Sequence, residues 1–320
     1  MRQKGKAKKP IRKIAKLILE RLGLLDMARR LKHRMCLAYN CIIGPTRRSC
    51  RYLYSYLRFI ISRRDALRHD DKDRRIISLL CPTRGRPWLA NRLISSVYKT
   101  AAFPERIEIL FYIDSNDDTK SIYMDFFSKT KQRCMRLGRC EFFSGEPSAL
   151  VKAWNILARE SRGEVLVIAN DDQVYVDYGW DVRLDEEVGK FPDLIFCMWF
   201  NDGDRGGEFC SFPIVGRRWV EAAGYLSPDT FGYIGTDPWI MNIAHRIGRL
   251  HHIPDVLVEH LHVSRDKAPP DETYRRRSTP ADVEKTYQKT GPAFDKTEAE
   301  RIEAANRLRQ AIEDYKNQNR

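Results

Sequence analysis

Short hydrophobic runs alternate with helix-like segments over the middle of this chain. Ile76–Leu80, Ile107–Ile113 and Glu164–Ala169 are rich in β-branched residues and predict buried strands. Trp88–Thr100 and Ala149–Ser161 have the length and spacing of helices. Strands separated by helices of this length predict βαβ units, and therefore an α/β fold with a mainly parallel sheet flanked by helices.

Polar residues follow each of the predicted strands. The first strand runs into the loop Cys-Pro-Thr-Arg-Gly-Arg-Pro at 81–87, the second ends at Asp114, and the third runs into Asn170-Asp171-Asp172. The carboxyl ends of parallel strands meet at one edge of a sheet, where ligands bind. Adjacent carboxylates repel unless a cation lies between them, and Mg²⁺ or Mn²⁺ takes such oxygen ligands. A polar turn is the alternative at 170–172, because Asn and Asp favour turns.

Positive charge is concentrated at the start of the chain. Residues 1–75 hold 23 Lys and Arg against 6 Asp and Glu, a balance of +17, which leaves −3 of the total +14 for the other residues. After Pro10, one face of a predicted helix carries apolar residues and the other carries Arg12, Lys13, Lys16 and Arg21. The apolar positions are Ile11, Ile14, Ile18, Leu22 and Leu25.

A basic amphipathic helix can lie on an anionic membrane surface, so residues 1–75 suggest a peripheral position on the inner face of the membrane. Packing on the protein's own domain and nucleic-acid binding are the alternatives. Neither a membrane-spanning run of roughly 18 apolar residues nor a secretory signal pattern is present. The eight cysteines form no C-x-x-C pair. These features predict a cytoplasmic protein with reduced thiols.

The order of these motifs resembles a known family. Pro-Thr-Arg-x-Arg-Pro after a first strand, an Asp ending the second, and an apolar strand closing in Asp-Asp are similar to the nucleotide-sugar half of family 2-like glycosyltransferases with the GT-A fold. Gly-Trp-Asp at 179–181 and the stretch Phe231–His262 resemble a bacterial and phage-associated subgroup. The resemblance covers about Ile76–Tyr274 and implies a GT-A-like, Rossmann-like sheet.

The resemblance implies a set of nucleotide-binding residues. Thr83 and Asp114 would lie around the nucleobase with Arg84 and Arg86 nearby, and Lys152 and Asn155 would lie on the helix beside the nucleotide. An ionised Asp only accepts hydrogen bonds, which favours a base with an imide N–H such as uracil. Ordinary turn, capping and exposed-helix roles are the alternatives. The full nucleotide-binding prediction is Pro82, Thr83, Arg84, Arg86, Asp114, Lys152, Asn170 and Asp171.

The metal motif of the family is Asp-x-Asp, from which this sequence departs. With Asn170 at the first position, Asn170 could reach a ribose hydroxyl and Asp172 would bind the ion. Val256, Val258, His260 and His262 lie on one face of a predicted strand, so His260 or His262 could supply a further ligand. His251 and His252, just before this strand, are predicted at the surface. The expected ion is Mg²⁺ or Mn²⁺.

The candidate catalytic base is Asp237 in Gly-Thr-Asp-Pro-Trp. In inverting GT-A enzymes the base lies at the start of such a helix, in a Glu-Asp-like motif; here Thr236 replaces the Glu. An N-cap role is the alternative, and a helix N-terminus would lower the pKa of this carboxyl. Asp202 and Asp204 are further candidates. Trp199 and Trp239 could either line an acceptor site or belong to the core.

The sequence thus predicts a metal-dependent glycosyltransferase of the hexosyltransferase type, inverting, that uses a nucleotide-sugar donor, UDP-type favoured. Its acceptor would be a glycan, a lipid-linked molecule or another hydroxyl compound. The predicted organisation is a basic helical leader at 1–75, a GT-A-like domain at 76–265, and a loop with an accessory helix at 266–320. That helix would open with a Thr297-x-x-Glu300 capping box and pack through Ile302, Ala305, Leu308 and Ile312. A nucleotidyltransferase and a non-catalytic nucleic-acid or nucleotide binder are the alternatives. The nucleotidyltransferase is disfavoured because Gly85 is the single glycine of its turn, so the chain has no glycine-rich phosphate loop there.

Overall fold

The computed structural model describes residues 25–62, 74–147, 150–231, 235–269, 271–272, 275 and 289–319. The amphipathic helix predicted over residues 11–25 therefore lies outside the described residues except for Leu25. The chain divides into two compact units. One comprises Met1–Arg48 and Leu261–Pro270, and the other comprises Ser49–His260 and Asp271–Arg320. The second unit holds the sheet.

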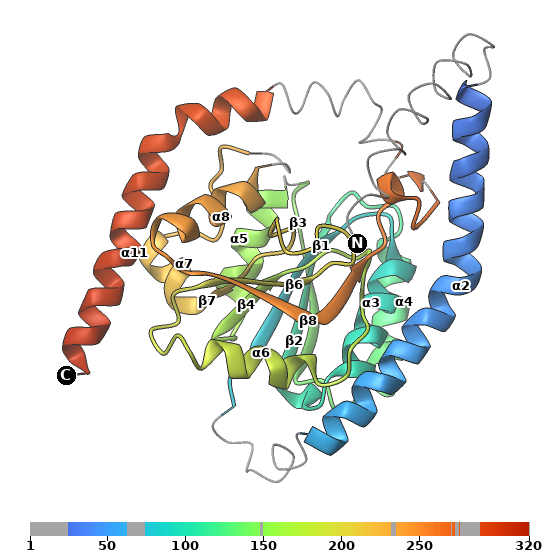
Figure 1. Cartoon of the computed structure of the whole chain (residues 1–320), viewed down its shortest axis with the longest axis horizontal. Helices are drawn as coiled ribbons and strands as arrows, with labels where there is room; N and C mark the ends of the chain where they lie inside the picture. Colours follow the sequence, from blue (N-terminus) through green and yellow to red (C-terminus); the bar gives the residue numbers. More distant parts are fainter. Residues whose placement is uncertain are drawn as a thin grey trace, which may run out of the picture. The chain divides into compact units, whose positions relative to one another are not determined.

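The described strands form one eight-stranded mixed sheet in the order β3-β2-β1-β4-β7-β6-β8-β5 (Figure 1). The pairs β1/β2, β2/β3, β1/β4 and β6/β8 are parallel, whereas β4/β7, β6/β7 and β5/β8 are antiparallel. The predicted mainly parallel α/β sheet is confirmed, with an antiparallel insertion at β7. The strands are β1 (Ile77–Thr83), β2 (Ile107–Asp114), β3 (Arg139–Gly145), β4 (Val165–Ile168), β5 (Gln173–Tyr175), β6 (Cys197–Asn201), β7 (Ile214–Gly216) and β8 (Leu250–His260).

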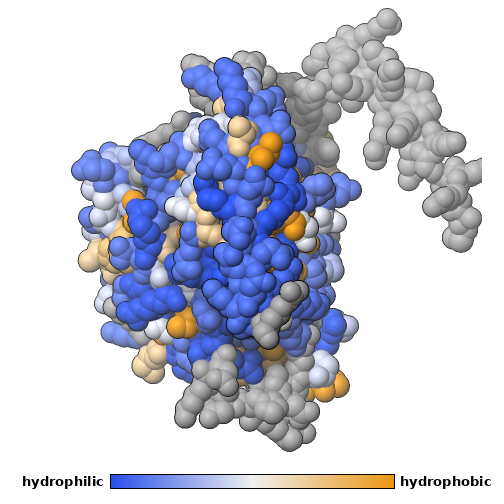
Figure 2. All heavy atoms as spheres, turned by 90° about the vertical axis from the view of Figure 1, so that its left-hand side faces the viewer, coloured by the Kyte–Doolittle hydropathy of each residue, from blue (hydrophilic) through white to orange (hydrophobic). Residues whose placement is uncertain are grey.

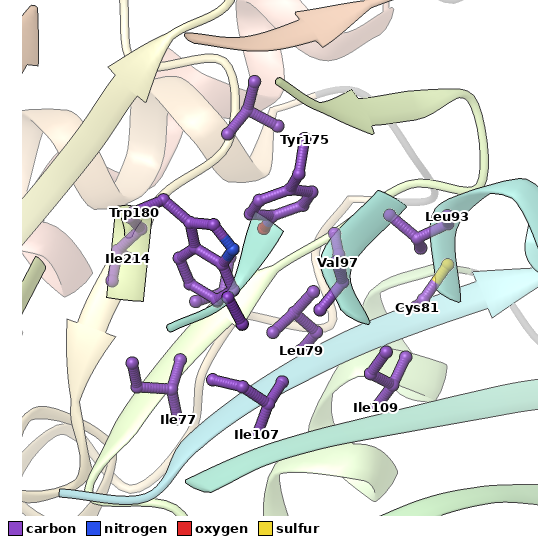
Figure 3. Close-up of a cluster of buried hydrophobic side chains, with 14 of the residues drawn as sticks. Ile77, Leu79, Cys81, Leu93, Val97, Ile107, Ile109, Tyr175, Trp180 and Ile214 are labelled. Atoms are coloured by element: carbon purple, nitrogen blue, oxygen red, sulfur yellow. The ribbon is translucent and has the colours of Figure 1, made fainter. Parts of the chain in front are cut away.

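Helices cover both faces of this sheet. One face packs against α3 (Pro87–Thr100), α4 (Lys120–Arg133) and α6 (Trp180–Val188). The other packs against α5 (Leu150–Glu160), α7 (Arg217–Ala223) and α8 (Thr236–Arg246), with α11 (Glu298–Gln318) lying on α7 and α8. Figure 3 shows the first core, in which Leu79 and Ile109 of the parallel strands meet Val97 and Trp180. Alternate strand residues enter opposite cores, because successive side chains point to opposite faces.

Several predicted elements needed correction. The first strand does not end at Leu80 but continues through Cys81 and Pro82 to Thr83, each paired with β2. His251 and His252 lie inside β8 rather than before it. His251 contacts Glu187, and the His252 ring stacks on Trp199 at 5.2 Å. The prediction that both were surface residues was wrong because the strand begins earlier than the Val256–His262 alternation suggests.

The C-terminal helix is present, but its capping box is not formed. Thr297 is the N-cap residue of α11, and its hydroxyl donates to the carbonyls of Ala293 and Phe294 rather than accepting from the helix. Ala305, Leu308 and Ile312 are buried as predicted, whereas Ile302 is 42% exposed. Figure 2 shows the side of the molecule that carries α11, which is largely hydrophilic with isolated hydrophobic residues.

The motif Gly-Trp-Asp at 179–181 has a structural role. Gly179 has φ +74°, and a Cβ at this position would lie 2.3 Å from the ring of Phe59. Trp180 is fully buried, and the Asp181 carboxylate accepts hydrogen bonds from the backbone N–H groups of Ala102 (2.9 Å) and Phe103 (2.8 Å). These three residues anchor the start of α6 to the end of α3 and to Phe59, which belongs to α2 (Leu25–Ser62).

No helix among the described residues is long and apolar enough to cross a bilayer. The seven cysteines that the structure describes are free thiols.

Candidate active site

Three strand ends meet at one pocket at the carboxyl edge of the parallel strands. The end of β1, the end of β2 and the turn after β4 supply most of its wall, and Leu150 and Ala153 of α5 close it. Its volume is about 100 Å³. Tyr112 also lines it and was not predicted. The predicted nucleotide-binding residues that line this pocket are Pro82, Thr83, Arg84, Arg86, Asp114, Asn170 and Asp171.

Two residues of α5 that were predicted beside the nucleotide do not line the pocket. Lys152 is exposed and is not part of the pocket wall. Asn155 has a structural role, because its side-chain amide donates to the carbonyl of Ser227 (2.7 Å) while its oxygen accepts from the N–H groups of Leu226 and Ser227. It thereby holds the loop that leads to α8.

A buried chain of hydrogen bonds fixes Asp171 in the pocket. The Thr83 hydroxyl donates to Asp171 Oδ2 (2.7 Å) and therefore accepts from the Tyr123 hydroxyl (2.7 Å). The Tyr123 hydroxyl in turn accepts from the backbone N–H of Arg86 (2.9 Å). Burial raises the pKa of Asp171 to about 6, and Asp172 acts in the same direction, whereas Arg86 and Thr83 oppose the shift. Asp171 is thus held in place by β1 and α4 together.

Tyr123 is a site residue that the sequence did not reveal. It lies on α4, 40 residues after Thr83, and is fully buried. Only the apolar spacing of α4 could have placed it toward the sheet, and α4 itself was not predicted. Its hydroxyl reaches the site because β1 and β2 are neighbours and α4 packs against them.

Removing the Tyr123 hydroxyl should lower the stability of the folded protein. Tyr123→Phe leaves the Arg86 N–H and the Thr83 hydroxyl without their partner, so the free energy of unfolding is expected to fall by about 1–3 kcal/mol. Tyr175→Phe is the matched control, since the buried Tyr175 hydroxyl has no hydrogen-bond partner within the described part of the chain. Urea denaturation measures both. Equal stability for the two variants would rule out the hydrogen-bond chain.

The second strand end carries an ion pair. An Arg84 Nη contacts Asp114 Oδ2, and the same nitrogen donates to Asn116 Oδ1 (2.8 Å). The Asp114 side chain is 9% exposed, so this pair lies at the pocket wall rather than in solvent. A nucleobase that hydrogen bonds to Asp114 would have to share the carboxylate with Arg84 or displace it.

Arg86 joins the pocket to the C-terminal part of the sheet unit. Its guanidinium lies 3.3 Å from Asp171 Oδ1 and 2.7 Å from Asp271 Oδ2. Burial lowers the pKa of Arg86, but the two carboxylates outweigh it, so the pKa is raised and the cation is retained. Asp271 was not predicted, because it lies in a charged, Pro-rich loop with no periodic pattern.

Asp172 and His260, two of the predicted metal ligands, lie next to each other. Asp172 Oδ1 is 3.3 Å from His260 Nε2, and the β5/β8 pair places Gln173 opposite His260. The His260 ring packs edge-on against Phe212 at 4.8 Å. His262 follows the end of β8, so the strand alternation extends only to His260 and a role of His262 at the metal stays a prediction.

Among the described residues no three His, Cys, Asp or Glu side chains converge to hold a metal ion. Mg²⁺ and Mn²⁺ sites of nucleotide-dependent enzymes commonly use one or two protein ligands and complete their coordination with phosphate oxygens and water. The oxygen and nitrogen donors of Asp172 and His260, beside the second carboxylate of Asp171, fit such an ion.

Asp237 lies in the first turn of α8 but is not its cap. The N-cap residue is Gly235, and Thr236 is the first helical residue. In the part of the chain that the structure describes, the Asp237 carboxylate makes no hydrogen bond or ion pair. Burial raises the pKa of Asp237 to about 8, with Arg205 partly opposing. The expected lowering of this pKa by the helix N-terminus was wrong, because the cost of burial exceeds the helix contribution.

The neighbouring residues fix the start of α8, and their hydrogen bonds lower the basicity of one alternative base, Asp202. The Thr236 hydroxyl is buried and hydrogen bonds to the Ser227 hydroxyl (2.7 Å). Asp202 accepts from the N–H groups of Asp204 and Arg205 and from the Ser211 hydroxyl. Burial raises the pKa of Asp202, but these donors outweigh it and lower the pKa, so Asp202 is a poor proton acceptor. Trp199 and Trp239 are buried in the second core rather than exposed at the site.

No protein-family model and no curated protein sequence matches this chain. The mannosyltransferase PcManGT from Pyrobaculum calidifontis, in complex with GDP-Man and Mn²⁺, is similar in structure at 13% identity and a TM-score of 0.49, over 86% of this chain and 85% of that one. S. aureus TarS 1–349 in complex with UDP is similar at 10% identity and a TM-score of 0.46, over 75% of this chain and 91% of that one. GalNAc-T7 with UDP, GalNAc and Mn²⁺ is similar at 15% identity and a TM-score of 0.49, over 61% of this chain and 45% of that one. Similarities this weak carry no argument about activity, which has to be inferred from the residues of this chain.

Proposed function

We propose that this chain is a metal-dependent glycosyltransferase with a GT-A-like fold, of the bacterial and phage-associated family 2 type. The observation that carries the proposal is the pocket at the carboxyl edge of the sheet. Residues from the ends of β1 and β2 and from the turn after β4 line it together, and Asp172 with His260 lies directly beyond Asp171. A nucleotide-sugar donor needs such a combination of a base site, cationic side chains and metal-binding carboxylates.

The pocket suits a nucleoside diphosphate. Asp114 and Thr83 would contact the nucleobase, and the Asp114 carboxylate favours a base that offers an imide N–H, as uracil does. The guanidinium groups of Arg84 and Arg86 would face the ribose and diphosphate, where they complement negative charge. Lys152, although outside the pocket, stays a candidate for the outer phosphate through its long, exposed side chain. A UDP-sugar is therefore the proposed donor, of the hexose type.

Asp172 and His260 would hold Mg²⁺ or Mn²⁺ beside the diphosphate, with His262 as a further candidate ligand. The ion would supply Lewis-acid stabilisation of the charge on the departing nucleotide. Burial of Asp171 next to Asp172 concentrates negative charge at this point and so favours a divalent cation.

Asp237 would act as the general base of an inverting transfer. Its carboxylate would accept the proton of the acceptor hydroxyl while that oxygen bonds to the anomeric carbon and the bond to the nucleotide breaks. A pKa of about 8 makes Asp237 a stronger base than an ordinary Asp, at the expense of being partly protonated near neutral pH. The proposed acceptor is a hydroxyl of a glycan or of a lipid-linked molecule at the cytoplasmic face of a membrane.

Thermal stabilisation by a panel of nucleotide sugars tests the donor site. A ligand that binds the folded state raises Tm, so a UDP-sugar should raise it in the presence of Mn²⁺ and less in the presence of a chelator. Nucleoside triphosphates serve as the comparison, because a nucleotidyltransferase would bind them and release pyrophosphate. Stabilisation by triphosphates alone would replace the proposal with that second enzyme class.

A further inference from the structure

Helix α2 exposes many large apolar side chains. Pro45 and the preceding Gly44 lie near its middle, and the helix continues through both. In the part that belongs to the first compact unit, the exposed apolar residues are Met27, Leu31, Met35, Tyr39, Ile42 and Ile43. In the part that belongs to the sheet unit, they are Leu53, Tyr54, Tyr56, Leu57 and Ile61. Met27, Leu31, Met35 and Tyr39 recur every four residues, as do Leu53, Leu57 and Ile61, so these side chains line one face of the helix.

Other residues hold α2 to the protein. In the sheet unit, Phe59 is 3% exposed and packs on Tyr178 at 5.1 Å, and Arg51 makes a bidentate ion pair with Asp177 (2.7–3.0 Å). In the first unit, His33 contacts Asp266, and the Asn40 side chain donates to the Asp266 carbonyl (2.8 Å). These residues occupy helical positions different from the exposed apolar set. Tyr56 also packs on Tyr178 (4.9 Å), whereas the more exposed Leu53, Leu57 and Ile61 take part in none of these contacts.

The charge of α2 distinguishes between possible partners. Its 38 residues include eight Lys and Arg and a single acidic residue, Asp26. Two copies of so basic a helix would repel each other, which disfavours a dimer formed through this face. An anionic lipid surface complements the charge, and it also accepts apolar side chains at the boundary between headgroups and acyl chains. The exposed tyrosines at 39 and 54 suit the same boundary.

We propose that α2 lies in the plane of an anionic membrane with its exposed apolar face inserted at the headgroup boundary. The described helix, rather than only the basic residues before it, would then hold the enzyme at the membrane. Basic residues such as Arg34 and Arg47, which are exposed, would contact the lipid phosphates. This attachment is independent of the donor site and would persist in a catalytically inactive variant.

Co-sedimentation of the full chain with vesicles tests the proposal. Vesicles of phosphatidylcholine with 30% phosphatidylglycerol should bind the protein, and pure phosphatidylcholine should bind it at least about tenfold less. The triple variant Leu53→Gln, Leu57→Gln, Ile61→Gln keeps the charge and should bind the anionic vesicles at least about tenfold more weakly. The matched control is Ile122→Gln, Met124→Gln, Met135→Gln, which removes three exposed apolar side chains from another part of the sheet unit and should bind as the wild type does.

Circular dichroism and urea denaturation establish that both triple variants fold. If the α2 variant is folded and still binds anionic vesicles with wild-type affinity, the apolar face is not the docking surface. A second variant, Met27→Gln, Leu31→Gln, Met35→Gln, repeats the test in the first unit. Concentration-dependent dimerisation that the α2 substitutions abolish, without vesicle binding by the wild type, would assign the face to a second copy of this chain and overturn the proposal.

Discussion

Replacing Asp237 by Asn is expected to lower sugar transfer by about 10²- to 10⁴-fold, which is the usual contribution of a general base. Asn has the shape of Asp but accepts no proton. Because Asp237 neither caps α8 nor lines the donor pocket, Mn²⁺-dependent nucleotide binding should stay near its wild-type value. A transfer assay and calorimetry with UDP measure the two quantities separately. Loss of binding together with transfer would mean that Asp237 acts on the donor instead.

The pH dependence of kcat/KM is an independent test of Asp237 as the general base. Since the pKa of Asp237 is about 8, the ionised fraction and the wild-type kcat/KM should rise as the pH increases to about 8 and then level off. The Asp237→Asn variant should lack this rise. Asp229→Asn is the matched control, because Asp229 is an exposed carboxylate in the loop before α8 and should keep both the rate and the pH profile. A wild-type profile in the Asp237→Asn variant would leave another group as the base.

The same shift predicts how Asp237 affects stability. The pKa of this carboxyl is higher in the folded state than its ordinary value of 3.8, so ionisation opposes folding. Its contribution to stability is complete below about pH 4 and is lost as the pH rises toward 8. The Asp237→Asn variant avoids this loss and should therefore be more stable than the wild type at pH 8, which urea denaturation would detect.

Asp172→Ala is expected to abolish transfer and Mn²⁺-dependent nucleotide binding together. The substitution removes the carboxylate that lies 3.3 Å from His260 and leaves the neighbouring Asp171 bound to Thr83. Removal of a metal-binding group should weaken UDP binding in Mn²⁺ to the level that the wild type shows with a chelator. Unchanged binding in Mn²⁺ would exclude Asp172 from the ion site.

A control separates this effect from a general loss of acidic charge. Asp125→Ala removes an exposed carboxylate of α4 that pairs with the neighbouring Lys129 (2.6 Å), so both binding and transfer should be unaffected. His260→Ala should weaken binding in Mn²⁺ less than Asp172→Ala does, because it leaves the carboxylates of the site in place. His262→Ala shows whether this residue takes part at all.

The sheet edge was predictable because strand ends carry a strong local signal. Hydrophobic runs that stop at Thr83, Asp114 and Asp171 define the ends of β1, β2 and the segment after β4, and the parallel order then brings these ends together. The pocket follows from that order alone. The strands β3, β5, β6 and β7 were not predicted. β5 and β7 have only three residues each and β3 is half-buried, whereas β6 carries a clear apolar run that the prediction overlooked.

The residues that the sequence missed depend on tertiary contacts. Tyr123 and Asp271 reach Thr83 and Arg86 from segments 40 and 185 residues away, a distance over which no periodic pattern carries information. The bounds of β8 were mispredicted for a related reason: the strand starts at Leu250 and ends at His260, and side-chain alternation shows the face of a residue but not the end of a strand.

Release of UDP from the donor selected by the thermal panel tests the central claim most directly. With Mn²⁺, the wild-type chain should hydrolyse a UDP-sugar slowly in the absence of an acceptor. A chelator should stop this release, and Asp172→Ala should show none in either condition. If no nucleotide sugar releases its nucleoside diphosphate in the presence of Mn²⁺, while a folded protein binds nucleic acid with steep salt dependence and without metal, the account of this chain as a glycosyltransferase is wrong.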